Sequence, residues 1–148
     1  MLKKIILPTP LMVICFLVFI IGGIPGKSNA DVVIVGNISI AVDSIKTSRL
    51  RDIFTGQIIN WDDGSGIILV TLSNNPVHTE FIKKYTKKTT MQYKLWWRRK
   101  VFCGEGLMPV SLSSESKLLK YVAETRGAIG YMSSVPENVD IKIITVAE

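Results

Sequence analysis

The sequence is poor in the side chains that form catalytic and metal sites. Its 148 residues hold a single histidine, His78, and two cysteines, Cys15 and Cys103. His78 and Cys103 show no recognisable metal-ligand spacing, and no Ser-His-Asp or Cys-His arrangement is visible. We therefore expect a protein that is not an enzyme, with no catalytic residues, no metal site and no cofactor.

The first thirty residues differ in character from the rest of the chain. Lys3 and Lys4 precede an almost wholly apolar run at 5–21, and the segment 28–30, Ser-Asn-Ala, places small residues at −3 and −1 of a cleavage site. This order is typical of a secretory signal peptide. We expect a cleaved leader and a periplasmic protein. The alternative is an uncleaved leader that anchors the protein to the inner membrane, because the apolar run is near the lower length limit for spanning.

Cleavage after residue 30 changes what remains. Residues 31–148 are enough for one domain with one core, and not for two. Lys3, Lys4 and Lys27 leave with the leader, so the net charge falls from +6 to +3. Cys103 becomes the sole cysteine, which excludes a disulfide within the mature chain. In an oxidising compartment such a thiol is either buried or paired with another molecule. Because Cys103 ends an apolar triplet, we expect it to be buried.

The mature part alternates between β-rich and helical patterns. Strands are predicted at 32–35, 67–72, 128–132 and 141–146, and helices at 49–54, after Pro76, from Thr90 to before Gly104, and from 113 or 114 to 122. In the helix that starts near Thr90, Met91, Leu95 and Trp96 are expected to face inward. Strands separated by helices predict one layered α/β domain, with a mixed sheet of about five strands flanked by helices.

Two segments carry a resemblance to a known family. Residues 53–61 follow the pattern IF-x-G-x-I-x-x-W, and residues 127–131 read Gly-Ala-Ile-Gly-Tyr. Both resemble segments of the phosphate-type ABC transporter periplasmic substrate-binding proteins (PstS-like). Between them, the predicted strand that ends at Leu72, its polar loop and the following helix occur in the order that the family has. The resemblance implies a type 2 periplasmic-binding-protein fold. Members of this family have two lobes, and residues 31–148 match one, so the resemblance implies a single-lobe member.

The resemblance also implies a ligand site after the second predicted strand. The family places an Arg and a Ser-Gly-Thr-like turn there, at a helix N-terminus that binds an anion. Here residues 73–79 read Ser-Asn-Asn-Pro-Val-His-Thr, with no Arg, and Pro76 removes one N–H donor. The implied ligand is phosphate or a similar oxyanion. The candidate binding residues are Ser73, Asn74, His78 and Thr79. For His78, the alternative is a surface or capping residue.

Two functions follow from these patterns. The first is an exported, non-catalytic solute-binding domain linked to phosphate ABC transport. The alternative is an interaction module of the cell envelope that keeps the fold without the ligand and binds an envelope protein or a second copy of itself through its exposed lobe surface.

The segment Lys83–Lys100 is strongly basic, with eight Lys or Arg residues and no acid. Such a patch attracts anionic partners, for example lipid headgroups. The alternative is two solvated helix faces. Export argues against nucleic acid as a partner, and the leader, if uncleaved, is the expected route of membrane contact.

Overall fold

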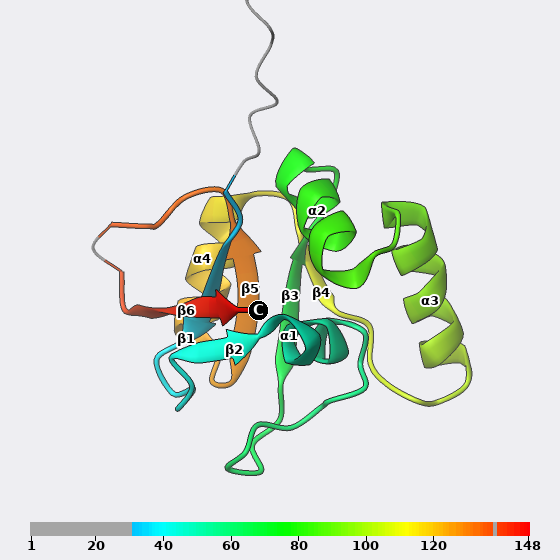
Figure 1. Cartoon of the computed structure of the whole chain (residues 1–148), viewed down its shortest axis with the longest axis horizontal. Coiled ribbons are helices and arrows are strands. Elements are labelled where there is room, and N and C mark those ends of the chain that lie inside the picture. Colours follow the sequence, from blue (N-terminus) through cyan, green and yellow to red (C-terminus); the bar gives the residue numbers. More distant parts are fainter. Residues whose placement is uncertain (1–30, 138) are drawn as a thin grey trace, which may run out of the picture.

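The computed structural model describes residues 31–137 and 139–148, so the predicted leader lies outside the described residues (Figure 1). Within this part of the chain no helix combines the length and apolarity needed to cross a bilayer. The elements in chain order are β1 (Val33–Asn37), β2 (Ser44–Lys46), α1 (Thr47–Phe54), β3 (Ile68–Leu72), α2 (Pro76–Phe81), the π-helical turn η1 (Ile82–Thr86), α3 (Thr90–Phe102), β4 (Val110–Leu112), α4 (Glu115–Glu124), β5 (Ala128–Met132) and β6 (Ile141–Ala147).

The strands form one mixed sheet in the order β2-β6-β1-β5-β3-β4. β1 is antiparallel to both of its neighbours, so Val35 pairs with Gly130 of β5 on one side and with Ile143 of β6 on the other. The pairs β2·β6, β3·β5 and β3·β4 are parallel. The predicted α/β class and mixed sheet are confirmed. The described sheet has six strands, because β2 and β4 add two short edge strands.

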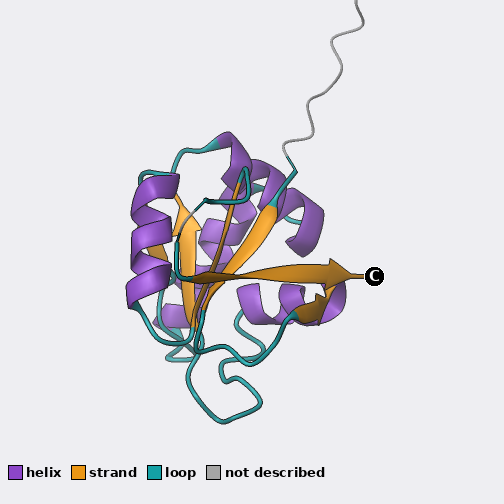
Figure 2. Cartoon of the chain, turned by 90° about the vertical axis from the view of Figure 1, so that its left-hand side faces the viewer, coloured by secondary structure: helices purple, strands orange, loops and turns teal. Residues whose placement is uncertain are grey.

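Helices cover both faces of this sheet (Figure 2). α4 contacts β1, β3 and β5, while α1 contacts β2 and β6 and α2 contacts β3 and β5. All five residues of β5 are buried between these layers. The buried Asn37 at the end of β1 donates from Nδ2 to the carbonyls of Val122 (2.8 Å) and Ala123 (2.9 Å), which satisfies acceptors at the C-terminal end of α4.

The two segments that carry the family resemblance contact each other. Trp61 is buried, and its Nε1–H donates to the carbonyl of Gly127 at 3.1 Å. Gly127 adopts φ +75°, which favours glycine, and a Cβ there would collide with the carbonyl of Gly66. The same Gly127 carbonyl accepts from the Ile68 amide at 3.1 Å, where β3 begins. Through these two hydrogen bonds, the two motifs hold the first residues of β3 and β5 next to each other.

The inward face of α3 differs from the prediction. Met91 and Leu95 are exposed and Trp96 is half-buried, whereas Tyr93 and Trp97 are buried. The reason lies at the C-terminus of α1, whose last carbonyls have no partner within the helix. Tyr93 Oη donates to the Phe54 carbonyl at 2.8 Å and Trp97 Nε1 donates to it at 3.2 Å.

Two further side chains of α3 complete this capping. Trp96 Nε1 donates to the Thr55 carbonyl at 3.0 Å, and Lys100 Nζ donates to the Gly56 carbonyl at 3.2 Å. Hydrogen bonding to a neighbouring helix end, rather than the apolar character of Met91 and Leu95, thus sets the orientation of α3.

The prediction of a buried Cys103 is wrong. The thiol is exposed, and Cys103 is the C-cap of α3, where the chain turns away through Gly104 with φ +71°. Its two apolar neighbours, Val101 and Phe102, are exposed as well. The triplet lies at the end of α3, and α3 is held against α1 by Tyr93 and Trp97. The triplet therefore stays at the surface although its residues are apolar.

Candidate functional site

A cleft of about 670 Å³ opens at the carboxyl end of β3. Four segments line it: the end of β3 with the following loop, the first turns of α2, the first half of α3, and the chain leading into β4. Its lining residues are Thr71, Leu72, Ser73, Asn74, Asn75, Pro76, His78, Thr79, Thr90, Met91, Tyr93, Lys94, Trp97, Met108, Pro109 and Ser111. The volume lies within the range typical of small-molecule sites.

All four predicted binding residues line this one cleft. Ser73 and Asn74 lie in the loop after β3, and His78 and Thr79 lie in α2. Asn74 and Thr79 are exposed, while Ser73 and His78 are half-buried. The fold thus brings the four side chains together, and their role in binding stays a prediction.

His78 rests against a buried tyrosine. Its Nδ1 lies within hydrogen-bond distance of the Tyr131 hydroxyl, and the Leu72 amide donates to the same hydroxyl at 3.2 Å. Burial raises the pKa of Tyr131, so the phenol keeps its proton. Burial also lowers the pKa of His78, which favours the neutral ring. In the tautomer in which the Tyr131 hydroxyl donates to Nδ1, the neutral His78 ring carries its proton on Nε2 and can donate it to a ligand.

Part of the donor capacity of the loop is used within the protein. Asn75 is the N-cap of α2, and its side chain accepts from the Val77 amide at 2.8 Å. The Ser73 amide donates to the Leu112 carbonyl at 2.9 Å, and the Ser73 hydroxyl points to the same carbonyl at 3.4 Å. Asn74 adopts φ +49°, a left-handed conformation that asparagine tolerates. Asn74 and Thr79 are accordingly the freer donors of the predicted set.

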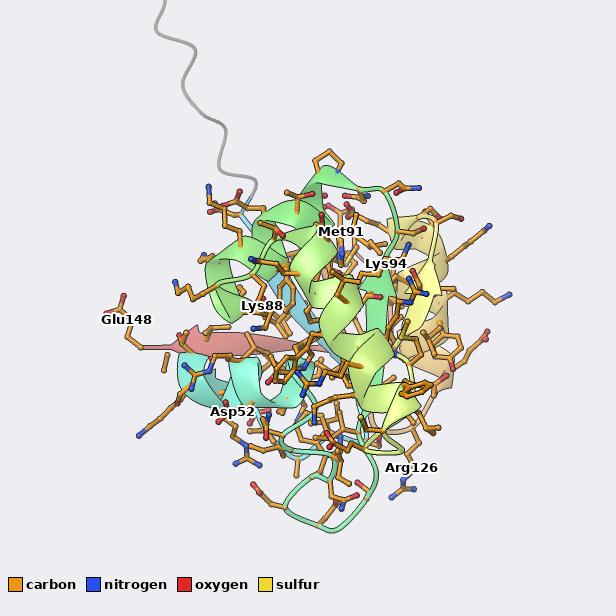
Figure 3. All side chains as sticks on the ribbon, turned by 90° about the vertical axis from the view of Figure 1, so that its right-hand side faces the viewer. Asp52, Lys88, Met91, Lys94, Arg126 and Glu148 are labelled. Carbon is orange, nitrogen blue, oxygen red and sulfur yellow. The ribbon has the colours of Figure 1, made fainter. Side chains whose placement is uncertain are left out.

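The structure adds a residue that the predicted site did not include. Lys94 of α3 lines the same cleft, and Figure 3 shows it near Met91 on the helix that fronts this side of the molecule. Among the described residues that line the cleft, Lys94 is the sole cation and none is a carboxylate. In the sequence, Lys94 belongs to the basic segment Lys83–Lys100. It is far along the chain from residues 73–79, so the sequence gives no sign that it lines the same cleft.

A mixed sheet with helices on both faces and an open cleft at a strand end is the arrangement of one lobe of a type 2 periplasmic-binding protein. The chain belongs to the family described as the PBP superfamily domain, whose model matches residues 30–140. No curated protein matches the sequence.

Solved structures of similar fold agree with this assignment. The chain superposes on PstS from Borrelia burgdorferi (TM-score 0.58, 15% identity, 78% of this chain and 46% of that one). It also superposes on an ABC-type phosphate transport receptor from Vibrio cholerae (0.59, 19%, 78% and 45%). A third match is a Clostridium perfringens protein, assigned to phosphate ABC transport and solved with bound phosphate (0.61, 14%, 78% and 44%). The chain spans less than half the length of each.

Proposed function

We propose that residues 31–148 form an exported, non-catalytic solute-binding domain whose ligand is phosphate or a similar small oxyanion. The observation that carries the proposal is the convergence of Asn74, His78, Thr79 and Lys94 on one cleft in which no carboxylate lies among the described lining residues. Hydrogen-bond donors and one cation without a competing anion suit a ligand that carries acceptor oxygens and negative charge.

Each proposed residue has a distinct part in this binding. Neutral His78 donates from Nε2, and Asn74 and Thr79 donate from their amide and hydroxyl groups. Lys94 supplies the positive charge that the missing Arg supplies in the family pattern. Because an ammonium group is a point charge and not a planar fork, we expect weaker and less selective binding than a bidentate Arg would give.

The similar structures support phosphate as the first ligand to test. The Clostridium perfringens protein holds phosphate, and the other two are named for phosphate transport. A role in phosphate ABC transport is part of the proposal, as is export by the leader. N-terminal sequencing of the protein from the periplasm should begin at Asp31; a retained Met1 would support the membrane-anchored alternative.

Calorimetric titration of residues 31–148 with inorganic phosphate tests the ligand. All six described strands and the core lie within these residues. We expect a saturable heat in the millimolar range, and in Lys94→Gln a loss of affinity of about tenfold or more, the contribution of a hydrogen bond to a charged group. Lys120→Gln, which changes an exposed lysine of α4 outside the cleft, is the matched control. Absence of heat at millimolar phosphate would overturn the proposal.

The second candidate function is an envelope interaction module. It is favoured by the coverage of the similar structures, since this chain matches less than half of each of them and so supplies one side of their architecture. Size-exclusion chromatography and crosslinking in the envelope distinguish the two. A chain that binds no phosphate but forms a defined complex is an interaction module, whereas a monomer that binds phosphate supports the first function.

A further inference from the structure

We propose that the outward face of α3 docks on a membrane surface with anionic headgroups. Met91, Leu95, Arg98 and Phe102, here called the α3 stripe, are spaced by four, three and four residues. This spacing places them along one face of the helix. The buried Tyr93 and Trp97 point the opposite way, toward α1. The helix therefore carries apolar side chains on two sides, and those of the α3 stripe are the ones left exposed.

The apolar members of the α3 stripe stand well out from the surface. Phe102 is 93% exposed, Met91 63% and Leu95 53%, and Leu107, in the loop that follows, is 89% exposed. α3 crosses the front of the molecule in Figure 3, with Met91 and Lys94 labelled on it and Lys88 in the connection that precedes it. Large side chains that protrude in this way, beside one another on one helix, mark an interaction surface.

Positive charge surrounds this apolar face. Lys94, Arg98 and Arg99 are exposed, and none of them takes part in the ion pairs found within the described residues. Residues 81–104 contain no acid. The next acid is Glu105, whose Oε2 lies 3.8 Å from Lys100 Nζ and forms an ion pair with it. The partner of this face must therefore combine negative charge with an apolar interior.

An anionic bilayer meets both requirements. An interfacial helix buries its apolar residues at the boundary between headgroups and acyl chains and keeps its cations at the headgroup level. A stable protein partner buries about 800 Å² on each side, whereas α3, with 13 residues, is about 20 Å long and offers a narrow strip. Nucleic acid would leave the protruding aliphatic side chains without a partner. Membrane contact would thus involve the folded domain itself, independently of the leader.

Vesicle co-sedimentation of residues 31–148 tests this proposal without the leader. One set of vesicles is pure phosphatidylcholine, and the other holds phosphatidylcholine and phosphatidylglycerol in equal parts. We expect binding to the anionic set, weakened by added salt. Arg98→Glu/Arg99→Glu should lower the partition coefficient by about tenfold or more, since each cation near an anionic surface contributes measurably. Leu95→Ser/Phe102→Ser should lower it as well, because it removes the inserted side chains.

Two matched controls separate this surface from general effects. Lys46→Glu/Lys120→Glu makes the same change in net charge on exposed residues of β2 and α4, and Ile38→Ser/Val135→Ser removes two other exposed apolar side chains. Both should bind vesicles almost as the unchanged protein does, and urea unfolding should show all four variants folded. Equal loss in the control variants, no binding to anionic vesicles, or self-association through α3 in their absence would each overturn the proposal.

Discussion

Tyr131 holds His78 in a defined state at the edge of the cleft. The Tyr131 hydroxyl accepts a hydrogen bond from the Leu72 amide and lies within hydrogen-bond distance of His78 Nδ1. The rings are stacked, with centroids 6.1 Å apart and an interplanar angle of 23°. Tyr131 ends the Gly-Ala-Ile-Gly-Tyr segment, and His78 lies in the loop-and-helix segment that the family resemblance assigned to the ligand. The contact between Tyr131 and His78 therefore connects the core to the candidate site.

Stability should depend on pH near neutrality through His78. Burial places the folded-state pKa of His78 below the ordinary value of 6.5. The unfolded chain therefore binds more protons than the folded chain as pH falls through this region, so the free energy of unfolding decreases with falling pH and levels off below the folded pKa. Urea unfolding from about pH 7.5 to about pH 5.5 measures this slope.

The variant His78→Asn identifies the source of that slope. His78 is the one histidine in the sequence, and asparagine keeps an acceptor for the Tyr131 hydroxyl without a titrating ring. We expect the variant to show a flatter profile over this pH range. An unchanged slope would mean that another group is responsible.

Loss of the Tyr131 hydroxyl should destabilise the fold. Tyr131→Phe leaves the buried Leu72 amide without its acceptor, which costs about 1–3 kcal/mol. The matched control is Tyr121→Phe, on a half-buried tyrosine whose hydroxyl makes no hydrogen bond within the described residues. Urea unfolding of both variants at neutral pH gives the difference, and equal values would contradict the proposed importance of the Tyr131 hydroxyl.

Gly56 should tolerate no side chain. It adopts φ +70°, and an added Cβ would lie 2.7 Å from the Trp97 ring. Gly56→Ala combines the cost of the left-handed conformation, about 1–2 kcal/mol, with overpacking of about 1–3 kcal/mol. Gly64→Ala isolates the first contribution, because Gly64 has φ +83° with nothing within 4 Å of the added Cβ. Thermal unfolding should place Gly56→Ala well below Gly64→Ala, and equal melting temperatures would exclude the ring contact.

The two donors that cap α1 should behave cooperatively. Tyr93 Oη and Trp97 Nε1 both donate to the Phe54 carbonyl. Tyr93→Phe alone leaves this carbonyl with one partner and should cost about 1 kcal/mol. In Tyr93→Phe/Trp97→Phe we expect a loss of stability greater than the sum of the single losses, since the carbonyl is then unsatisfied. Strict additivity in this cycle would contradict the capping role.

The long strands were predictable from sequence and the short ones were not. The runs 67–72 and 128–132 are apolar because they become β3 and β5, near the middle of the sheet. β2 and β4 have three residues each and form through parallel pairing with β6 and β3. Such edge strands depend on partners far away in the sequence, and local pattern does not reveal them. The predicted orientation of α3 was wrong for the same reason, because the carbonyls at the end of α1, a distant segment, determine which face of α3 is buried.

The part of the candidate site that lies within residues 73–79 was predictable from the sequence. Residues 73–79 follow one strand and open one helix, so their proximity is a property of the segment itself. Lys94 reaches the cleft because Tyr93 and Trp97 anchor α3 to α1, and this tertiary contact has no signature in the spacing of the sequence. Cys103, in turn, was misplaced because an apolar triplet at a helix end resembles a core segment.

The central claim, that this cleft binds a small oxyanion, is tested most directly by nuclear magnetic resonance. Residues 31–148 labelled with ¹⁵N are titrated with phosphate, and chloride at matched ionic strength serves as the control. We expect saturable shifts concentrated in the amides of residues 73–75 and 77–79 and around Lys94, with the rest of the sheet unchanged. An absence of phosphate-specific shifts in these residues at millimolar concentration, or shifts confined to other surfaces, would contradict it.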